Sequence, residues 1–236
     1  MEAPAKIVVE RLSPATRDDY LAFFDHERGP AFSDNPEWAR CYCQFYRIPR
    51  ALDWKAFTAD QNRVAAGASI ACGEAEGYLA KVDVIPPEAR EASFPPEGGS
   101  ALGAARRARG ETVGWLHAAP RHKLPHGFER MRVEPPEIDV PPQEAAIIVC
   151  FVIAPAWRRR GVATALLDAA LVDLAARGIA IVDAFPFKSG ESDSPADHYH
   201  GPASLFASRG FEAIGGNDDV TVMRCRLAMP GVPVEA

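Results

Sequence analysis

One short segment carries most of the chemistry that can be read from this chain. Residues 152–163 read VIAPAWRRRGVA, in which three consecutive arginines (158–160) are followed by Gly161 and Ala163. An apolar run precedes the segment and a helical pattern follows it. The first turn of a helix has unpaired backbone N–H groups at its positive dipole end, and small residues let an anion approach them closely. The segment therefore predicts a site for a pyrophosphate.

Two other phosphate-binding patterns do not occur in the chain. It has neither the Gly-x-Gly-x-x-Gly fingerprint of dinucleotide-binding folds nor the Gly-x-x-x-x-Gly-Lys-Ser/Thr sequence of a P-loop. The anion predicted above is therefore expected to belong to another class of phosphate-bearing ligand.

The elements that position this segment are expected to be strand, helix and strand. Ala145 to Ile153 is continuously apolar, which is typical of a strand covered on both faces. Gly161 to Arg177 has apolar residues at helical spacing, and Gly178 is suited to cap its end. Ile179 to Phe185 is a second apolar run. This order predicts two parallel strands joined by a right-handed crossover.

The rest of the chain predicts elements on both sides of that unit. The first helix is expected to start at Ser13-Pro14 and to reach about Glu27, because a hydroxyl cap before proline favours a helix start. Residues 32–49 and 119–143 are read as irregular, and Ile85 to Gly110 as an inserted Pro/Gly-rich loop. Further expectations are strands at Lys6–Leu12, Tyr78–Val84, Glu111–His117 and Val220–Leu227, a helix at Trp54–Ala66 capped by Asp53 with Gly67 near its end, and a short helix at Pro202–Ser208 before a Gly210-Phe211 turn.

The arginine segment resembles the acetyl-CoA-binding motif of the GNAT family of N-acetyltransferases, Arg/Gln-x-x-Gly-x-Gly/Ala. Arg158, Gly161 and Ala163 stand at its fixed positions. Tyr199 to Phe211 (YHGPASLFASRGF) resembles the family's second CoA-side helix, and Asp34 to Cys43 is similar to a stretch of a bacterial subgroup of unassigned substrate. The resemblance implies a single domain over residues 1–236 with the α/β GNAT fold, a mixed, mostly antiparallel twisted sheet of about six to seven strands flanked by about four helices.

The resemblance also implies acetyl-CoA as co-substrate, with no metal. The end of the apolar strand is expected to splay from its neighbour and to pair with the pantetheine, and its backbone N–H groups are expected to polarise the thioester carbonyl. The expected cofactor-binding residues are Phe151, Val152, Ile153, Arg158, Arg159, Arg160, Gly161, Val162, Ala163 and Thr164.

No spacing in the sequence singles out the acid or the base of the transfer. The family's usual proton donor, a tyrosine, aligns with Phe206, which cannot donate a proton. Tyr199 and Ser204 lie nearby and are the candidate acids. A carboxylate is the usual base, and the candidates are Asp34, Glu37, Asp183 and Glu144, of which we retain Glu144.

An aromatic and sulfur-rich stretch is expected to line the acceptor pocket, where it would suit a flat or alkylammonium group. A hydrophobic lid over the core is the alternative. The stretch consists of Trp38, Cys41, Tyr42 and Cys43, followed by Phe45 and Tyr46. Cys-x-Cys without a second pair is a poor zinc signal, and His117, His122 and His126 are expected to be loop histidines.

The charge and the cysteine content limit which classes of partner and which cell compartment we expect. The net charge of −6 disfavours nucleic acid and anionic membranes, and no apolar stretch is long enough to span a bilayer. Five cysteines without a scaffold-like spacing favour a reducing cytoplasm. We therefore expect an enzyme that acetylates the primary amine of a small molecule and allow for a homodimer. The alternative is a non-catalytic acyl-CoA-binding or regulatory module of the same fold.

Overall fold

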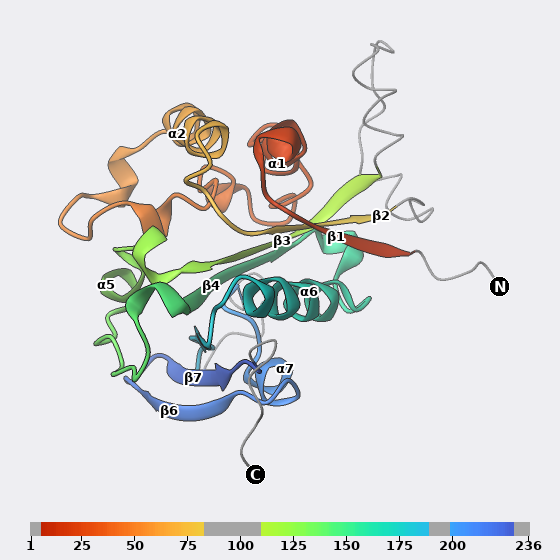
Figure 1. The fold of residues 1–236 in the computed structure, drawn as a ribbon. Helices are drawn as coiled ribbons and strands as arrows, with labels where there is room; N and C mark the ends of the chain where they lie inside the picture. The colour runs from red at the N-terminus through yellow and green to blue at the C-terminus, as the bar shows by residue number, and fades with distance from the viewer. Residues whose placement is uncertain (1–5, 83–109, 189–198, 229–236) are drawn as a thin grey trace. The chain divides into compact units, whose positions relative to one another are not determined.

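The structure is a computed structural model, and it describes residues 6–82, 110–188 and 199–228 (Figure 1). The insertion expected over residues 85–110 falls outside these ranges except for its last residue. Within the described ranges, no helix is long and apolar enough to cross a membrane.

In the described residues, seven strands form one sheet in the order β1-β2-β3-β4-β5-β7-β6. β4 and β5 are parallel, whereas β2, β7 and β6 are antiparallel to β1, β5 and β7 respectively. The expected mixed, mostly antiparallel sheet is therefore confirmed, and so is the parallel pair around the central helix. The bounds are β1 Ile7–Arg11, β2 Tyr78–Val82, β3 Glu111–Pro120, β4 Ala145–Ile153, β5 Ile181–Ala184, β6 Glu212–Gly216 and β7 Thr221–Arg226.

Five α-helices occur in the described residues: α1 Arg17–Phe23, α2 Ala59–Ala71, α5 Gly127–Met131, α6 Val162–Ala176 and α7 Ala203–Ala207. Short 3-10 turns lie between them: η1 Pro14–Thr16, η2 Pro36–Trp38, η3 Phe45–Arg47, η4 Trp54–Ala56, η5 Arg121–Lys123, η6 Pro142–Glu144 and η7 Pro155–Trp157. The stretch 119–143, expected to be a loop, thus contains the end of β3, the helix α5 and two 3-10 turns.

The two N-terminal helices depart from the sequence prediction. The first begins as expected after Ser13 but ends at Phe23. The second was predicted from Trp54, but Asp53 caps only the single turn η4. The helix starts after Thr58, because Thr58 and Gln61 form a reciprocal capping box that satisfies two N–H groups at once.

Gly67 lies inside α2 and does not end it. Arg17 of α1 donates from its Nε to the Gly67 carbonyl over 3.1 Å, and a Cβ at position 67 would lie 3.1 Å from the Arg17 guanidinium. The absent side chain therefore allows α1 and α2 to approach closely, which explains a glycine within a helix.

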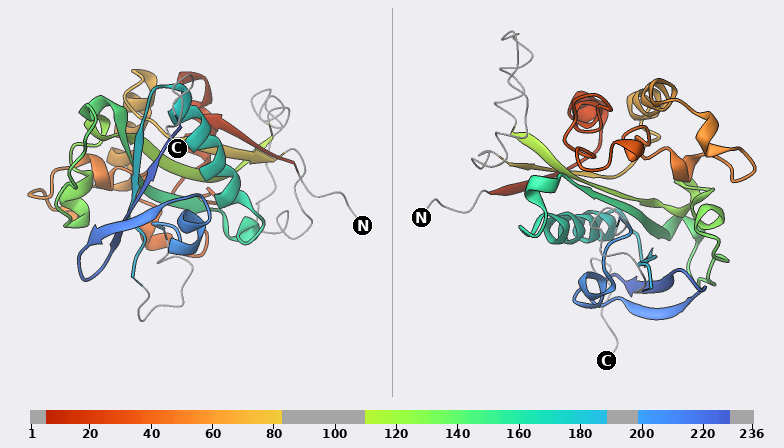
Figure 2. Two further views of the ribbon diagram at one scale, coloured as in Figure 1. Left: turned by 60° about the horizontal axis from the view of Figure 1, so that its bottom comes forward. Right: turned by 180° about the vertical axis from the view of Figure 1, so that it is seen from behind.

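The chain divides into two compact units. Unit 1 holds β1, β2 and the start of α6, and its core packs Trp115 edge-on against Tyr20 at 4.9 Å. Unit 2 holds β5, β6 and β7, and β6 and β7 form an antiparallel pair (Figure 2). Unit 1 comprises Met1–Tyr42, Thr58–Trp115 and Val152–Leu166, and unit 2 comprises Cys43–Phe57, Leu116–Phe151 and Leu167–Ala236.

Candidate active site

The arginine segment of unit 1 forms an open turn at the start of α6. Arg159 and Gly161 both adopt left-handed backbone angles, with φ of 60° and 81°. A Cβ at Gly161 would meet no atom within 4 Å, so the space beside this residue is open. The helix ladder begins with the bond from Ala165 N–H to the Gly161 carbonyl, at 2.9 Å. The N–H groups of the first turn precede that bond and are the orphan donors of the helix.

The three arginines of the segment differ in their surroundings. Arg158 donates from Nε to the Ile153 carbonyl over 3.2 Å, and its two terminal nitrogens hold both carboxylate oxygens of Asp34. Arg159 and Arg160 are exposed, and the Arg160 guanidinium lies 5.8 Å from the Trp157 ring centroid. The segment therefore presents cationic side chains beside the open turn, and one of them already holds a carboxylate.

The pairing of the central strand β4 with β5 ends before the last residues of β4, and the predicted splaying stays a prediction. The register of β4 with β5 runs from Ala145 opposite Ile181 to Ile148 opposite Ala184 and goes no further. The backbone N–H of Phe151 instead donates to the Tyr199 carbonyl. This corrects the expectation for Phe151, because its amide is engaged within the protein and is not free to polarise a thioester.

The helix α7 carries Phe206, which has no proton to donate to a leaving thiolate. Phe206 is wholly buried, with its ring centroid 5.2 Å from that of Phe211 and 6.0 Å from that of Phe151. Ser204 lies on the exposed side of the same short helix. Ser204 therefore stays a sequence prediction that no contact in the structure supports.

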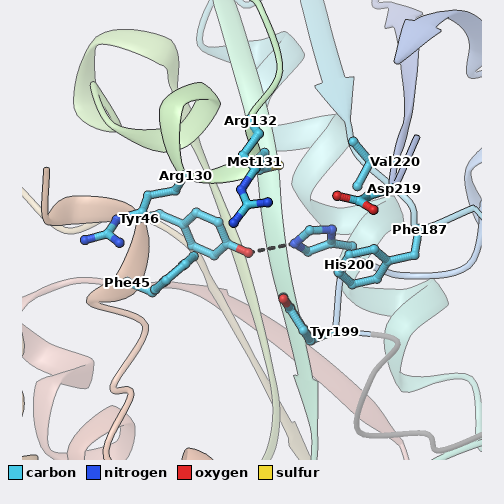
Figure 3. Close-up of a pocket in the computed structure, with 10 residues that line it drawn as sticks. All are labelled: Phe45, Tyr46, Arg130, Met131, Arg132, Phe187, Tyr199, His200, Asp219 and Val220. Atoms are coloured by element: carbon cyan, nitrogen blue, oxygen red, sulfur yellow. Dashed lines mark hydrogen bonds between the residues drawn. The ribbon is translucent and has the colours of Figure 1, made fainter. Parts of the chain in front are cut away.

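A pocket in unit 2 gathers residues that are far apart in the sequence (Figure 3). It has a volume of about 120 Å³. The Tyr46 hydroxyl and His200 Nε2 are 2.7 Å apart at its buried end, and the Tyr199 hydroxyl points toward this pair (Figure 3). The Phe187 ring stacks on the His200 ring at 4.2 Å. The lining residues are Phe45, Tyr46, Arg130, Met131, Arg132, Phe187, Tyr199, His200, Asp219 and Val220.

Two buried histidines give unit 2 its unusual electrostatics. Burial lowers the pKa of His200 to about 4, an effect only partly offset by the nearby Phe185 carbonyl. Burial, together with the positive charge of Arg47, lowers the pKa of His117 to about 3. Both rings are therefore neutral at pH 7. His117 lies on β3 in the core, which corrects the expectation of a loop histidine.

The charged groups of the pocket have different roles. Arg130 donates to the carbonyls of Ile48 and Pro49, each over 2.8 Å, and its guanidinium lies 4.7 Å from the Phe45 ring centroid. It therefore holds the segment that carries Phe45. Arg132 and Asp219 are exposed at the pocket, where they present one positive and one negative charge to a ligand.

The residues predicted to line the pocket for the acceptor amine come just before Phe45 and Tyr46 in the sequence. Tyr42 is wholly buried, and its hydroxyl accepts from the His26 N–H over 3.1 Å and lies 2.9 Å from His26 Nδ1. Tyr42 and Cys43 both have left-handed backbone angles, with φ of 42° and 47°, a strained conformation for residues with side chains. Trp38 and Cys41 are half-buried. None of these four residues lines the pocket described above, whereas Phe45 and Tyr46 do.

The structure places two of the candidate bases, Asp183 and Glu144. Asp183 is fully buried, and Arg224 Nε donates to it over 2.7 Å while Arg121 binds its other oxygen. Glu144 precedes β4, and Phe151 follows seven residues later, about 23 Å along the strand. Glu144 and Phe151 thus lie at opposite ends of β4, and the role of Glu144 as a base stays a prediction.

Sequence reasoning missed His200, Arg132 and Asp219. Only His200 had a signal, because it follows Tyr199 in the stretch that resembles the CoA-side helix. For metals, the described part of the chain contains no group of three or more histidine, cysteine or carboxylate side chains that could hold an ion.

Comparisons with known proteins agree with this architecture. The model of the GNAT acetyltransferase family matches residues 73–200, more than half of the chain. A structure described as a candidate acetyltransferase, from Acinetobacter baylyi ADP1, is 10% identical, covers 100% of both chains and has a TM-score of 0.51. The PaiA N-acetyltransferase from Thermoplasma acidophilum, solved with coenzyme A, is 8% identical over 94% of this chain and 99% of its own, with a TM-score of 0.45. A search of curated proteins finds no match in sequence.

Proposed function

Because the chain belongs to the GNAT acetyltransferase family, whose general chemistry is acetyl transfer from acetyl-CoA, we propose that it is an N-acetyltransferase. The acceptor in this proposal is the primary amine of a small molecule. The products are the acetamide and free coenzyme A.

The observation that carries the proposal is the open turn before α6. Gly161 leaves free space beside the orphan N–H groups of the first helical turn, and Arg159 and Arg160 are exposed beside it. In the proposal, this turn binds the pyrophosphate of acetyl-CoA through the backbone of Val162 to Thr164. The positive end of the α6 dipole adds to the attraction for the anion.

The acceptor is proposed to bind in the pocket of unit 2. A cavity of about 120 Å³ admits a small amine better than a folded protein surface. Tyr199 links the cavity to the end of β4, because its carbonyl accepts from Phe151 N–H while its hydroxyl points into the cavity. We assign Tyr199 as the group that protonates the departing thiolate. Asp219 at the rim offers a negative charge that attracts an ammonium group.

Two observations favour the alternative, a module that binds acyl-CoA without turning it over. Phe206 stands where the family's proton donor is expected, and it is buried among aromatic rings. The Phe151 amide is engaged by Tyr199. A binding module would take up acetyl-CoA and release no thiol with any amine.

Thermal unfolding with and without acetyl-CoA tests the first half of the proposal. A ligand at about 100 times its Kd stabilises the folded state by about 2.7 kcal/mol, which raises the melting temperature by about 5 to 10 °C for a chain of this size. Gly161→Glu should abolish that rise, because a carboxylate would repel the pyrophosphate.

Gly73→Glu is the matched control. Gly73 also belongs to unit 1, has a φ of 74° and has no atom within 4 Å of a Cβ. The backbone strain and the added charge are therefore the same, but acetyl-CoA should still raise the melting temperature. No rise in the wild type at millimolar acetyl-CoA would refute the pyrophosphate site. Thiol release with a panel of primary amines then separates an enzyme from a binding module.

A further inference from the structure

The buried end of the pocket holds a pair of groups that can exchange a proton. Tyr46 belongs to the 3-10 turn η3, and His200 precedes α7. The tyrosine hydroxyl and His200 Nε2 are 2.7 Å apart, both side chains are buried, and both line the cavity. A buried hydrogen bond of this kind between two titratable groups at a cavity is the arrangement that proton transfer requires.

The surroundings keep His200 neutral, so that its Nε2 can accept a hydrogen bond from Tyr46. Tyr46 can donate to His200 only when Nε2 is unprotonated, and burial keeps the ring neutral at pH 7. The stacked Phe187 ring holds the imidazole plane in place. The charged or titratable groups that face the pair are Arg130, Arg132 and Asp219 of the pocket lining, Tyr199 beside the His200 ring, and His117, whose ring centroid lies 6.5 Å from that of Tyr46.

We propose that Tyr46 and His200 are the proton-transfer pair of the acetylation. This inference rests on the proposed function and names the base of the reaction. It is preferred to the four carboxylates considered from the sequence, because Asp183 is held by two arginines, Glu144 lies at the far end of β4, Asp34 is paired with Arg158, and Glu37 is exposed on η2.

The proton movements balance in this scheme. The amine nitrogen attacks the thioester carbonyl carbon, and the new C–N bond forms. The amine then gives a proton to the Tyr46 oxygen while the Tyr46 proton moves to His200 Nε2. The C–S bond breaks, and the thiolate takes the proton of Tyr199. His200 Nε2 then releases its extra proton to solvent, and the Tyr199 phenolate takes one proton up from solvent, so the number of protons on the protein is unchanged. The products are the acetamide and the coenzyme A thiol, and the protein is restored.

The test measures coenzyme A thiol release with four probe amines: ethanolamine, 2-phenylethylamine, L-lysine and L-glutamate. Tyr46→Phe removes the hydroxyl that relays the proton. His200→Gln keeps a hydrogen-bonding atom near the position of Nε2 but cannot carry the proton. Each substitution should lower kcat by about 100-fold to 10,000-fold, whereas the melting-temperature rise caused by acetyl-CoA should stay unchanged. The double variant should be no slower than the slower single variant.

A buried tyrosine and a half-buried histidine serve as controls. Tyr20→Phe removes a buried tyrosine hydroxyl that donates to the Tyr42 carbonyl over 2.8 Å, and His26→Gln alters a second histidine that contacts a tyrosine hydroxyl. Both controls should retain the wild-type kcat. A role limited to holding the fold would leave His200→Gln as active as the wild type, and that result would overturn the inference.

A spectroscopic measurement distinguishes failure of this inference from failure of the proposed function. Histidine ¹⁵N NMR at pH 7 should show His200 neutral with its proton on Nδ1, and a proton on Nε2 would refute the relay. If the wild type binds acetyl-CoA but releases no thiol with any of the four amines, the proposed function itself fails. If release occurs and persists in both pocket variants, only the relay fails.

Discussion

His117 and His200 are buried in unit 2 as neutral rings, and their burial makes the free energy of unfolding depend on pH. Their pKa values in the folded protein are about 3 and about 4, against an ordinary value of 6.5. At pH values between the folded pKa and the ordinary pKa of each histidine, the unfolded chain therefore binds more protons than the folded chain. The stability that these neutral rings provide is complete above pH 6.5 and decreases as the pH falls through this window.

The magnitude follows from the size of the two shifts. Each pH unit below 6.5 costs about 1.4 kcal/mol for each histidine until the folded pKa is reached. At pH 5 each ring has lost about 2 kcal/mol, so the free energy of unfolding should fall by about 4 kcal/mol between pH 7 and pH 5. Exposed carboxylates such as Asp168, whose pKa is lowered by the bound Arg209, act in the same direction but mainly below about pH 4.5.

Urea-induced unfolding followed by circular dichroism at pH 7 and pH 5 measures this difference. His117→Asn and His200→Gln should each halve the difference between the two pH values, to about 2 kcal/mol, whatever their effect at pH 7. A substitution that weakens packing lowers the free energy of unfolding at both pH values, so the packing loss cancels in the difference between them. A difference that stays near 4 kcal/mol in both variants would show that other groups cause the pH dependence.

Three further substitutions test individual assignments. Phe206→Tyr should not raise the rate of thiol release and should lower the free energy of unfolding by about 1 to 3 kcal/mol, because the new hydroxyl would be buried without a partner; a faster enzyme would contradict this. Asp183→Asn should lower the free energy of unfolding by about 3 to 5 kcal/mol, because two partly buried arginines lose their buried counter-charge; unchanged stability in urea would disprove the ion cluster. Asp34→Asn should tighten acetyl-CoA binding by no more than about fivefold, because a half-exposed ion pair with Arg158 is worth about 1 kcal/mol or less, and calorimetric titration showing weaker binding would mean that Asp34 positions the arginine.

The sequence by itself determined the central βαβ unit and the turn at which we propose that an anion binds. β4 matches the apolar run from Ala145 to Ile153 residue for residue, and α6 lies within one residue of the predicted bounds. These features are local: a doubly covered strand needs a continuous apolar run, and a helix start needs small residues and a cap. The family resemblance rests on the same local residues, which is why it could be stated from the sequence.

The sequence did not decide between residues that could each begin or end a helix. Both Asp53 and Thr58 can cap a helix, and only the reciprocal bond between Thr58 and Gln61 decided where α2 begins. Gly67 gave a stop signal in the sequence, but its role is to admit Arg17 from α1. A glycine that serves a close contact and a glycine that ends a helix look alike until the contacting element is in place.

Only the tertiary structure decided the pocket. Tyr46 and His200 are 154 residues apart in the sequence, and no spacing rule connects them. The same holds for Asp183, which appeared as a free carboxylate in the sequence and is neutralised by arginines from two other segments. The protonation state of a side chain depends on its burial and on its neighbours in space. The sequence therefore specified the turn proposed to bind a phosphate, whereas the side chains proposed to move a proton came together only in the tertiary structure.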